Sequence, residues 1–357
     1  MKKVLLVGYF GMDNLGDELI LDLLIRSIKK FAPSSPISVL SGRPQETEGC
    51  YGVRAQQRKN PFVCLRAVVE NDIIVMSGGL FQDRTSSFSL YYYLSFILAA
   101  RIFGKKILLL GVGIDGLKKY NRSVAGFLLS LPDRILVRDS NSLEFMQEYG
   151  RVTDEKKLTL TADFVVTLNH SVSADDTRDD KKRKKRFAFI LKELEFLEPE
   201  FWARVAESSS KRFNADVVFP VFHRRKDLDY IRKVSALMQV QSDVVLWERP
   251  DDILKAFGGF DMVIGSRLHA LVLAGLFAIP ICGFSDDRKV DLFLRELEQK
   301  NVYPGMKETL QSTYSSRHPT AAVTVKSSAE SSVETVMAVI SDSWNWREHF
   351  RDKCRVN

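Results

Sequence analysis

The sequence predicts an α/β protein with two Rossmann-like, doubly wound domains that face a cleft. Short apolar stretches alternate with helical ones along most of the 357 residues, and this alternation is typical of parallel sheets covered by helices. A charged segment, SVSADDTRDDKKRKKR at residues 171–186, divides the alternation into two similar halves. The length also fits two domains of about 150 residues each. This architecture is that of the glycosyltransferase-B fold.

In the first half, short and often β-branched apolar runs predict strands that are buried on both faces. The runs are Val4–Val7, Ile37–Leu40, Ile73–Met76, Ile107–Leu110, Ile135–Val137 and Leu158–Thr161. Helices are predicted between them, for example at Glu18–Phe31 and Ser142–Tyr149. The least polar stretch, Thr85–Ala100, contains four serines and is shorter than a membrane span of about 20 residues. We therefore expect it to form a core helix.

The second half repeats the pattern. Strands are predicted at Phe187–Leu191, Val217–Pro220, Val244–Trp247, Met262–Ile264 and Ile279–Cys282. Helices are predicted at Pro199–Phe213, Leu228–Met238, Asp251–Phe257 and Val290–Gln299. We divide the chain into a first domain (1–172), a charged linker (173–186), a second domain (187–310) and a final segment (311–357). The final segment is rich in Ser and Thr, and its helix is expected to pack back on the body.

The net charge of +7 and the pI near 9.1 come in part from the basic run Lys181–Arg186. This run is either a solvated linker or a segment attracted to an anionic membrane surface or a polyanionic acceptor. Nucleic acid is not expected as a partner, because no aromatic residues interleave with the run and no nucleic-acid-binding motif occurs. The four cysteines show no CxxC or metal-binding spacing, which favours reduced thiols. We expect a cytoplasmic protein without a signal peptide, in peripheral contact with the inner face of the cell membrane if the basic run binds lipid.

Ligands of doubly wound sheets bind at the carboxyl ends of the strands, so candidate site residues are sought in the strand-to-helix turns. The first turn, GYFGMDNLGD at residues 8–17, has neither the GxGxxG spacing of dinucleotide sites nor the Lys-Ser/Thr of a P-loop. Either Asp17 caps the following helix, or Asn14 and Asp17 contact a substrate.

The second turn, SGGLFQDR, follows the strand that ends at Met76. Gly78 and Gly79 permit close approach of a ligand to the backbone, and Gln82 and Asp83 add polar groups that a plain tight turn does not need. We therefore include these four residues among the candidates for substrate binding.

A third, glycine-rich turn occupies residues 111–116, and a fourth begins with Arg138 and Asp139. Arg138 and Asp139 either form an ion pair that caps the next helix, or Arg138 binds substrate.

The fifth turn, GSRLHALVLAG at residues 265–275, places two cationic or titratable side chains where a strand becomes a helix. Ser266 is expected to cap that helix, with Arg267 and His269 in its first turn. Cations at a helix N-terminus oppose the macrodipole unless an anion is bound there. A histidine packed in the core would explain His269 alone, but the pair favours an anion site with a proton donor.

These motifs resemble those of the polysaccharide pyruvyl transferase family. The matching stretches are GMDNLGDE (Gly11–Glu18), SGGLFQD (Ser77–Asp83), VRDSNS (Val137–Ser142) and, most specifically, GSRLHALVLA (Gly265–Ala274). The resemblance covers residues 1–299 and is greatest to bacterial members that modify a secondary cell-wall polymer used to anchor S-layer proteins. It implies a glycosyltransferase-B-like fold that needs no metal or cofactor, with phosphoenolpyruvate as co-substrate. The implied product is a pyruvate ketal on two hydroxyls of a sugar or a lipid-linked oligosaccharide, with release of phosphate.

By this resemblance, Arg267 would bind the negative charges of the donor and His269 would be the general acid. Lys289 matches a lysine that follows the next strand in the family, although Asp287-Arg288 stands where Asp-Pro is expected. Arg58 is a further donor-binding candidate. The second domain would then be the donor side and the first domain the acceptor side.

The chemistry agrees with this assignment, since a carboxylate and a phosphate on one small molecule suit guanidinium groups and histidine is the usual acid near neutral pH. The base that accepts the sugar hydroxyl proton stays open among Asp13, Asp17 and Asp83. Two other classes also stay open: a nucleotide-sugar-dependent glycosyltransferase of the same fold and a non-catalytic polysaccharide-binding protein.

Overall fold

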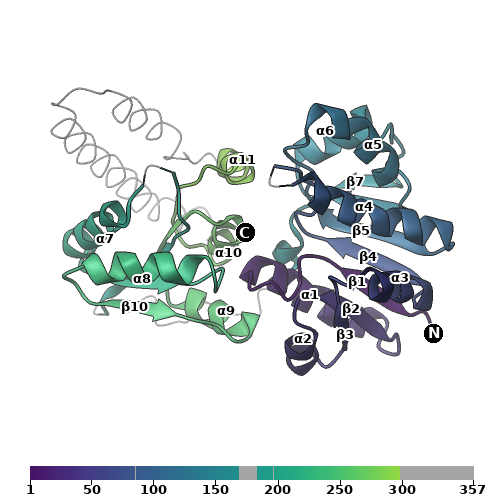
Figure 1. The fold of residues 1–357 in the computed structure, drawn as a ribbon. Coiled ribbons are helices and arrows are strands. Elements are labelled where there is room, and N and C mark those ends of the chain that lie inside the picture. Colours follow the sequence, from purple (N-terminus) through teal and green to yellow (C-terminus); the bar gives the residue numbers. More distant parts are fainter. Residues whose placement is uncertain (85, 169–182, 196, 298–357) are drawn as a thin grey trace, which may run out of the picture. The chain divides into compact units, whose positions relative to one another are not determined.

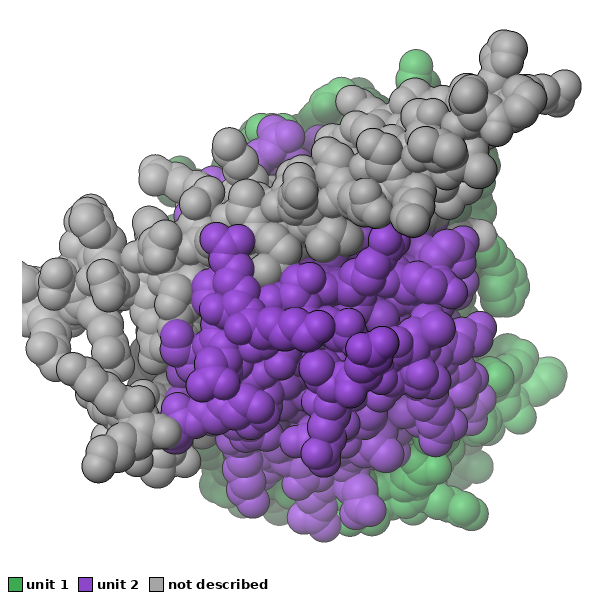
Figure 2. Space-filling view, turned by 90° about the vertical axis from the view of Figure 1, so that its left-hand side faces the viewer, with its two compact units in different colours: residues 1–168 green, residues 169–357 purple. Residues whose placement is uncertain are grey.

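The computed structural model describes residues 1–84, 86–168, 183–195 and 197–297. The chain divides into two compact units, with the boundary between Leu168 and Asn169, and Figure 2 colours them separately. Each unit is a parallel α/β sheet and is described by itself.

Unit 1 contains a seven-stranded parallel sheet in the order β3-β2-β1-β4-β5-β6-β7 (Figure 1). The strands are β1 (Val4–Val7), β2 (Ile37–Ser41), β3 (Arg54–Gln57), β4 (Ile73–Ser77), β5 (Lys106–Val112), β6 (Arg134–Val137) and β7 (Leu158–Leu160). The helices are α1 (Leu15–Phe31), α2 (Pro44–Tyr51), α3 (Pro61–Glu70), α4 (Ser87–Ile102), α5 (Lys119–Leu129), α6 (Ser140–Glu148) and the 3₁₀ turn η1 (Phe164–Thr167). Apolar side chains of the central strands and of α4 form the core, among them Leu5, Ile74, Leu109 and Ile97.

Six of these strands were predicted, within two residues at each end, but β3 was not. Its sequence, RAQQ, is polar because β3 lies at the edge of the sheet, where only Ala55 is buried. Helix α4 corrects the expectation of a core helix at Thr85–Ala100. Leu90 and Ile97 on its inner side are buried, whereas Phe88 and Leu98 on its outer side are exposed.

Unit 2 contains a five-stranded parallel sheet in the order β10-β9-β8-β11-β12. The strands are β8 (Lys185–Ile190), β9 (Ala215–Pro220), β10 (Ser242–Val245), β11 (Met262–Gly265) and β12 (Ile281–Gly283). The helices are α7 (Pro199–Phe213), α8 (Asp227–Leu237), α9 (Pro250–Gly258), α10 (Leu268–Leu276) and α11 (Arg288–Glu296). Its core is aromatic, with Trp202, Phe187, Phe189, Phe219 and Phe284 buried together.

The predicted linker and basic run require a correction at their end. Strand β8 begins at Lys185, so Lys185 and Arg186 belong to unit 2. Arg183 pairs with the buried Asp261 at 2.7 Å, and Lys184 pairs with Asp216 at 2.6 Å. Arg183, Lys185 and Arg186 therefore belong to the folded part of unit 2, whereas the pair of Lys184 and Asp216 is exposed on its surface. Residues 173–182 of the linker, residues 298–310 of the second domain and the final segment lie outside the described residues.

Both sheets reverse their strand order at one place. Consecutive connections run outward on either side of the pair β1 and β4 in unit 1, and of the pair β8 and β11 in unit 2. The carboxyl ends of such a pair form a crevice that binds ligands in doubly wound folds. The turns after β1, β4, β8 and β11 are therefore the first places to seek a site. Among the described helices, none is both long enough and apolar enough to cross a membrane.

Candidate functional site

The ends of β8, β11 and β12 meet at Ser266. The Ser266 Oγ accepts the backbone N–H of Lys192 at 3.0 Å and donates to the carbonyl of Ile190 at 3.2 Å. The Ser285 Oγ donates to the carbonyl of Ser266 at 3.2 Å. Ser266 is buried by these contacts, so it joins the strand ends and does not cap α10 as predicted. The N-cap residue is Arg267, which makes no side-chain capping bond.

Arg267 forms a two-pronged ion pair with Asp227, the first residue of α8. Its Nε donates to Asp227 Oδ2 at 3.2 Å, and its Nη2 donates to Asp227 Oδ1. The Asp227 side chain is only 1% exposed, and its Oδ2 also accepts the backbone N–H of His223 at 2.8 Å. The pair uses two of the five N–H groups of the guanidinium. Asp227 therefore orients Arg267, whose side chain is 24% exposed, at the carboxyl end of the sheet.

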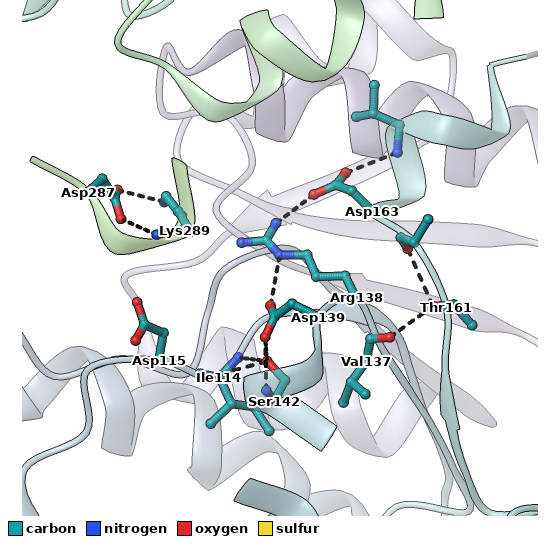
Figure 3. A network of polar contacts seen from close by, with 12 residues as sticks. Ile114, Asp115, Val137, Arg138, Asp139, Ser142, Thr161, Asp163, Asp287 and Lys289 are labelled. Atoms are coloured by element: carbon teal, nitrogen blue, oxygen red, sulfur yellow. Dashed lines mark hydrogen bonds and ion pairs between the residues drawn. The ribbon is translucent and has the colours of Figure 1, made fainter. Parts of the chain in front are cut away.

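Two lysines lie at the same edge. Lys192, which follows β8, pairs with Asp286, and its side chain is 20% exposed. Lys289 pairs with Asp287 at 3.3 Å (Figure 3). Asp287 is the N-cap of α11, since its Oδ1 accepts the backbone N–H of Lys289 at 3.2 Å. Each cation is thus held beside a carboxylate at the end of a strand.

His269 is half-buried and is the second residue of α10, directly after the end of β11. With Arg267, Lys192 and Lys289 it places one titratable group and three cations around the strand pair where the order of the sheet reverses. The arrangement offers N–H donors for an anionic ligand and, in His269, a side chain of the type that carries a proton near neutral pH. Among the described residues, no three His, Cys, Asp or Glu side chains are gathered so that they could hold a metal ion.

Unit 1 presents a second polar edge, and Arg138 lies at its centre. The Arg138 side chain is 6% exposed, and its Nη1 donates to Asp163 at 2.6 Å (Figure 3). Asp139 is 3.9 Å from Arg138 Nε and caps α6 by accepting the Ser142 N–H at 2.8 Å. The predicted pair with Asp139 is therefore the weaker contact, since Arg138 bonds mainly to Asp163.

The glycines of the second and third turns make room for Arg138. A Cβ added to Gly113 would lie 2.8 Å from Nε and Nη2 of Arg138, and one added to Gly79 would lie 3.4 Å from Nη2. The backbone at the ends of β4 and β5 is therefore packed against the guanidinium.

Asn14 is the N-cap of α1, because its Oδ1 accepts the Gly16 N–H at 3.3 Å. Of the two alternatives for Asp17, the role of helix cap is wrong, because Asp17 already lies in the first turn of α1. Asn14 Nδ2 donates to Asp17 Oδ2, and Asp17 Oδ1 is 3.3 Å from the position of a Cβ on Gly78. Gly78 has φ +99°, a conformation that suits glycine. The first and second turns therefore meet at Asp17 and Gly78.

Asp83 and Gln82 serve the loop that they belong to. Asp83 is fully buried, and its two oxygens accept from the backbone N–H of Lys118 at 2.9 Å and from Asn121 Nδ2 at 2.5 Å. Gln82 Oε1 accepts the Arg84 N–H at 3.0 Å. These contacts assign Asp83 a structural role and remove it from the candidates for the base.

Arg58 is buried in a cage of aromatic rings. It donates to the Gly8 carbonyl at 3.1 Å and to the Tyr93 hydroxyl at 2.8 Å. Its guanidinium carbon lies 5.3 Å from the ring centre of Tyr9 and 5.4 Å from that of Tyr92. Arg58 therefore stabilises the first turn of unit 1 through its hydrogen bond to the Gly8 carbonyl.

Glu18 ends the motif GMDNLGDE but was not among the predicted site residues. Its Oε1 accepts the Gly11 N–H at 2.6 Å and its Oε2 accepts the Tyr51 hydroxyl at 3.1 Å. Burial raises the pKa of Glu18 to about 7, although those two hydrogen bonds oppose the rise, while Asp17 and Asp13 add to it. A carboxyl that titrates near neutral pH thus holds the first turn in place.

We expect the Glu18→Gln variant to be more stable than the wild type at pH 8 but not at pH 4. Because the folded-state pKa is raised, the folded protein binds more protons than the unfolded chain between about pH 4.5 and 7, and stability falls across this range. The loss amounts to roughly 3 kcal/mol at most. Gln keeps an acceptor for the Gly11 N–H and does not titrate.

The test is urea unfolding of variant and wild type at pH values from 4 to 8, with far-UV circular dichroism as the readout. The quantity compared is the difference between their urea midpoints at each pH. Glu48→Gln is the control, because Glu48 is exposed and its Oε1 also accepts a backbone N–H, that of Ala55 at 2.9 Å. A difference that does not change with pH for Glu18→Gln, or an equal change for Glu48→Gln, would contradict the prediction.

Lys192 and Asp227 were also missed. Lys192 directly follows the predicted strand Phe187–Leu191, and Asp227 begins the helix after the predicted strand Val217–Pro220. A search that covered every strand-to-helix connection of the second half would have found both.

The comparisons with known proteins concern the family and the fold. The model of the family described as "Polysaccharide pyruvyl transferase" matches residues 14–288, a range that contains Arg138, Lys192, Arg267 and His269 and ends just before Lys289. No curated protein matches the chain significantly.

Solved structures show the same fold at low identity. The UDP complex of MnaA from S. aureus has a TM-score of 0.59 at 12% identity and covers 88% of this chain and 87% of that one. The UDP-GlcNAc 2-epimerase from Neisseria meningitidis bound to UDP-GlcNAc has a TM-score of 0.55 at 10% identity, covering 96% and 99%. Anabaena Alr3699/HepE in complex with UDP and glucose has a TM-score of 0.51 at 12% identity, covering 100% of both. These likenesses confirm the predicted glycosyltransferase-B-like fold class.

Proposed function

The chain belongs to the polysaccharide pyruvyl transferase family, and from this premise we propose that its donor is phosphoenolpyruvate and its product a pyruvate ketal. The acceptor is a sugar of a cell-surface polysaccharide or of its lipid-linked precursor, and the leaving group is inorganic phosphate. The observation that carries the proposal is the cluster of Arg267, His269, Lys192 and Lys289 around the ends of β8, β11 and β12.

The charges of this cluster fit the donor. Phosphoenolpyruvate carries a carboxylate and a phosphate on one small carbon skeleton, and guanidinium and ammonium groups bind both. Asp227 holds Arg267 by two hydrogen bonds, so that the guanidinium is oriented before the donor arrives. Pre-orientation of this kind lowers the entropy that binding has to overcome.

The reaction needs an acid and a base. His269 donates a proton to the methylene carbon of the donor, and the central carbon becomes electrophilic. The first sugar hydroxyl adds to that carbon and loses its proton to a carboxylate. The second hydroxyl displaces phosphate from the same carbon, and phosphate takes up the second proton. Asp13 and Asp17 stay candidates for the base, on the acceptor side that we assign to unit 1.

We expect phosphate release to require both phosphoenolpyruvate and a sugar acceptor, and to continue in excess EDTA. The chain has no HxxxH or CxxC motif, and in its DxD sequence, Asp227-Leu228-Asp229, the first carboxylate is bonded to Arg267. The three cations provide the N–H donors for the anionic groups of the donor. The measurement is phosphate and UDP release from reactions that contain either phosphoenolpyruvate or a panel of UDP-sugars, each with synthetic mono- and disaccharide acceptors.

A ketal carbon in the ¹³C spectrum of the product, together with phosphate release, supports the proposal. Release of UDP in place of phosphate would identify a nucleotide-sugar glycosyltransferase, and binding of saccharides with neither release would identify a binding protein. Activity that EDTA abolishes and Mg²⁺ or Mn²⁺ restores would show that a metal is required.

A further inference from the structure

Three neighbouring helices of unit 1 carry apolar stripes on their outer sides. Helices α3, α4 and α5 lie side by side on one face of the sheet, with α4 in contact with both of the others (Figure 1). Ten large apolar side chains on them are between 44% and 83% exposed. We call these ten residues the three-helix apolar surface: Phe62, Leu65 and Val69 on α3, Phe88, Tyr91, Leu98 and Ile102 on α4, and Tyr120, Val124 and Phe127 on α5.

The spacing of these residues shows that each stripe follows one side of a helix. On α4 the positions 88, 91, 95, 98 and 102 alternate by three and four residues and are all exposed, and all but Ser95 are apolar. Arg101 is exposed beside this stripe. The opposite side of α4, including Leu90, Leu94 and Ile97, is already buried in the core. The fold of unit 1 therefore gives no reason for the outer stripes to be apolar.

These residues are also concentrated. Of the nineteen exposed large apolar side chains among the described residues, eleven lie on α3, α4 and α5 or, as Phe103, directly after α4. Single exposed apolar residues are normal on protein surfaces, whereas a contiguous group marks an interaction site.

The charges around the three-helix apolar surface are mostly positive. Residues 58–134 contain eleven Lys and Arg against five Asp and Glu, an excess of six in a chain whose net charge is +7. Helices α4 and α5 contain no acidic residue, and the one on α3, Glu70, is paired with Arg66 at 2.5 Å. The exposed basic residues of this range are Lys59, Arg66, Arg84, Arg101, Lys106, Lys118, Lys119 and Arg134.

We propose that the three-helix apolar surface docks on an anionic lipid bilayer, with the three helices lying in the plane of the membrane. Helices with an apolar side and basic residues beside it bind in this way, because apolar burial adds to attraction by anionic headgroups. A symmetric dimer through the same surface would bring these basic residues against their own copies, so the charges favour lipid over a second chain.

The docked orientation would bring lipid to a functional edge of unit 1. Phe62, Phe88 and Tyr120 are each the second residue of their helix. Helices that connect parallel strands begin at the carboxyl edge of the sheet, which is the edge that carries Gly78 and Arg138. Membrane docking is inferred from the three-helix apolar surface and does not depend on the proposed function. If the acceptor is lipid-linked, docking would bring the protein to its substrate.

The test is binding of the full chain to vesicles in the absence of donor and acceptor. Vesicles of phosphatidylcholine alone are compared with vesicles that also contain phosphatidylglycerol, at low and high salt, by co-flotation. The variant Phe88→Ser/Phe127→Ser removes two aromatic rings that are 80% and 64% exposed. The matched control is Phe31→Ser/Leu246→Ser, which removes side chains that are 82% and 54% exposed elsewhere on the molecule.

We expect wild type and control to bind anionic vesicles and to be released by salt, as ionic contacts require. The Phe88→Ser/Phe127→Ser partition coefficient should fall at least about tenfold, since two aromatic side chains no longer enter the apolar layer. Its activity on a water-soluble acceptor should be unchanged, which separates this inference from the proposed function. No binding by the wild type, equal binding by variant and wild type, or a wild-type dimer that Phe88→Ser/Phe127→Ser converts to monomer in sedimentation would overturn the proposal.

Discussion

Replacing His269 by Gln is expected to lower kcat by about 10²–10⁴, the usual contribution of a general acid, while donor binding stays within a few-fold of the wild type. His269 is half-buried at the end of β11, beside the cation cluster, and Gln has a similar size and can form hydrogen bonds. Gln cannot hold the proton that the methylene carbon needs. The loss should therefore appear in kcat and not in the donor Kd.

The pH profile gives a second measurement. Because the acid must be protonated, wild-type activity should fall on the alkaline side, and the Gln variant should lack that limb. His223→Gln is the control, since His223 also lies at the carboxyl edge of the unit 2 sheet, where its backbone N–H contacts Asp227. This control should keep the alkaline limb even if its activity is lower. A His269→Gln variant with near-wild-type kcat, or with the same limb, would show that another group is the acid, and Lys289 would be examined first.

The sequence predicted those strands and helices whose own residues carry the signal of their burial. Central strands such as β1 and β11 are buried on both faces, so their sequences are uniformly apolar and easy to recognise. Strand β3 has polar residues because it lies at an edge, and nothing local distinguishes RAQQ from a loop. The start of β8 was also not predicted, because Lys185 and Arg186 are charged like the residues that precede them.

The positions of the site residues in the fold could be predicted from the sequence, but their ion-pair partners could not. The rule that ligands bind at strand ends located Arg267, His269 and Arg138 correctly at such ends. Their partners depend on which strands become neighbours. Asp227 is forty residues from Arg267 and Asp163 is 25 residues from Arg138, and only the packed sheet brings each carboxylate to its guanidinium. The hydrogen-bond partners of Glu18 likewise come from two places in the chain, Tyr51 of helix α2 and Gly11 of the first turn.

Replacing Arg267 by Ala is expected to weaken phosphoenolpyruvate binding by about 1.5–3 kcal/mol, the value of one charge-assisted hydrogen-bonded contact, or about 10- to 150-fold in Kd. The variant should also lose stability, because the Asp227 carboxylate, 1% exposed, is left without its guanidinium. The loss of donor affinity and the loss of stability have different origins. A second arginine–aspartate ion pair in unit 2 allows them to be separated. Arg183 donates from two nitrogens to Asp261, at 2.7 Å and 2.8 Å, where β8 and β11 begin. Arg183→Ala should therefore cost stability at the opposite edge and leave the donor Kd unchanged.

The double variant Arg267→Ala/Asp227→Ala completes the argument. Removing the buried carboxylate together with the arginine should recover part of the lost stability, since no unpaired charge remains, but it should not recover donor affinity. Isothermal titration with phosphoenolpyruvate measures donor affinity, and urea unfolding followed by tryptophan fluorescence measures stability. If Arg267→Ala binds phosphoenolpyruvate as the wild type does, or if the double variant restores donor affinity, Arg267 acts only as the structural partner of Asp227, and the donor must be held by Lys192 and Lys289.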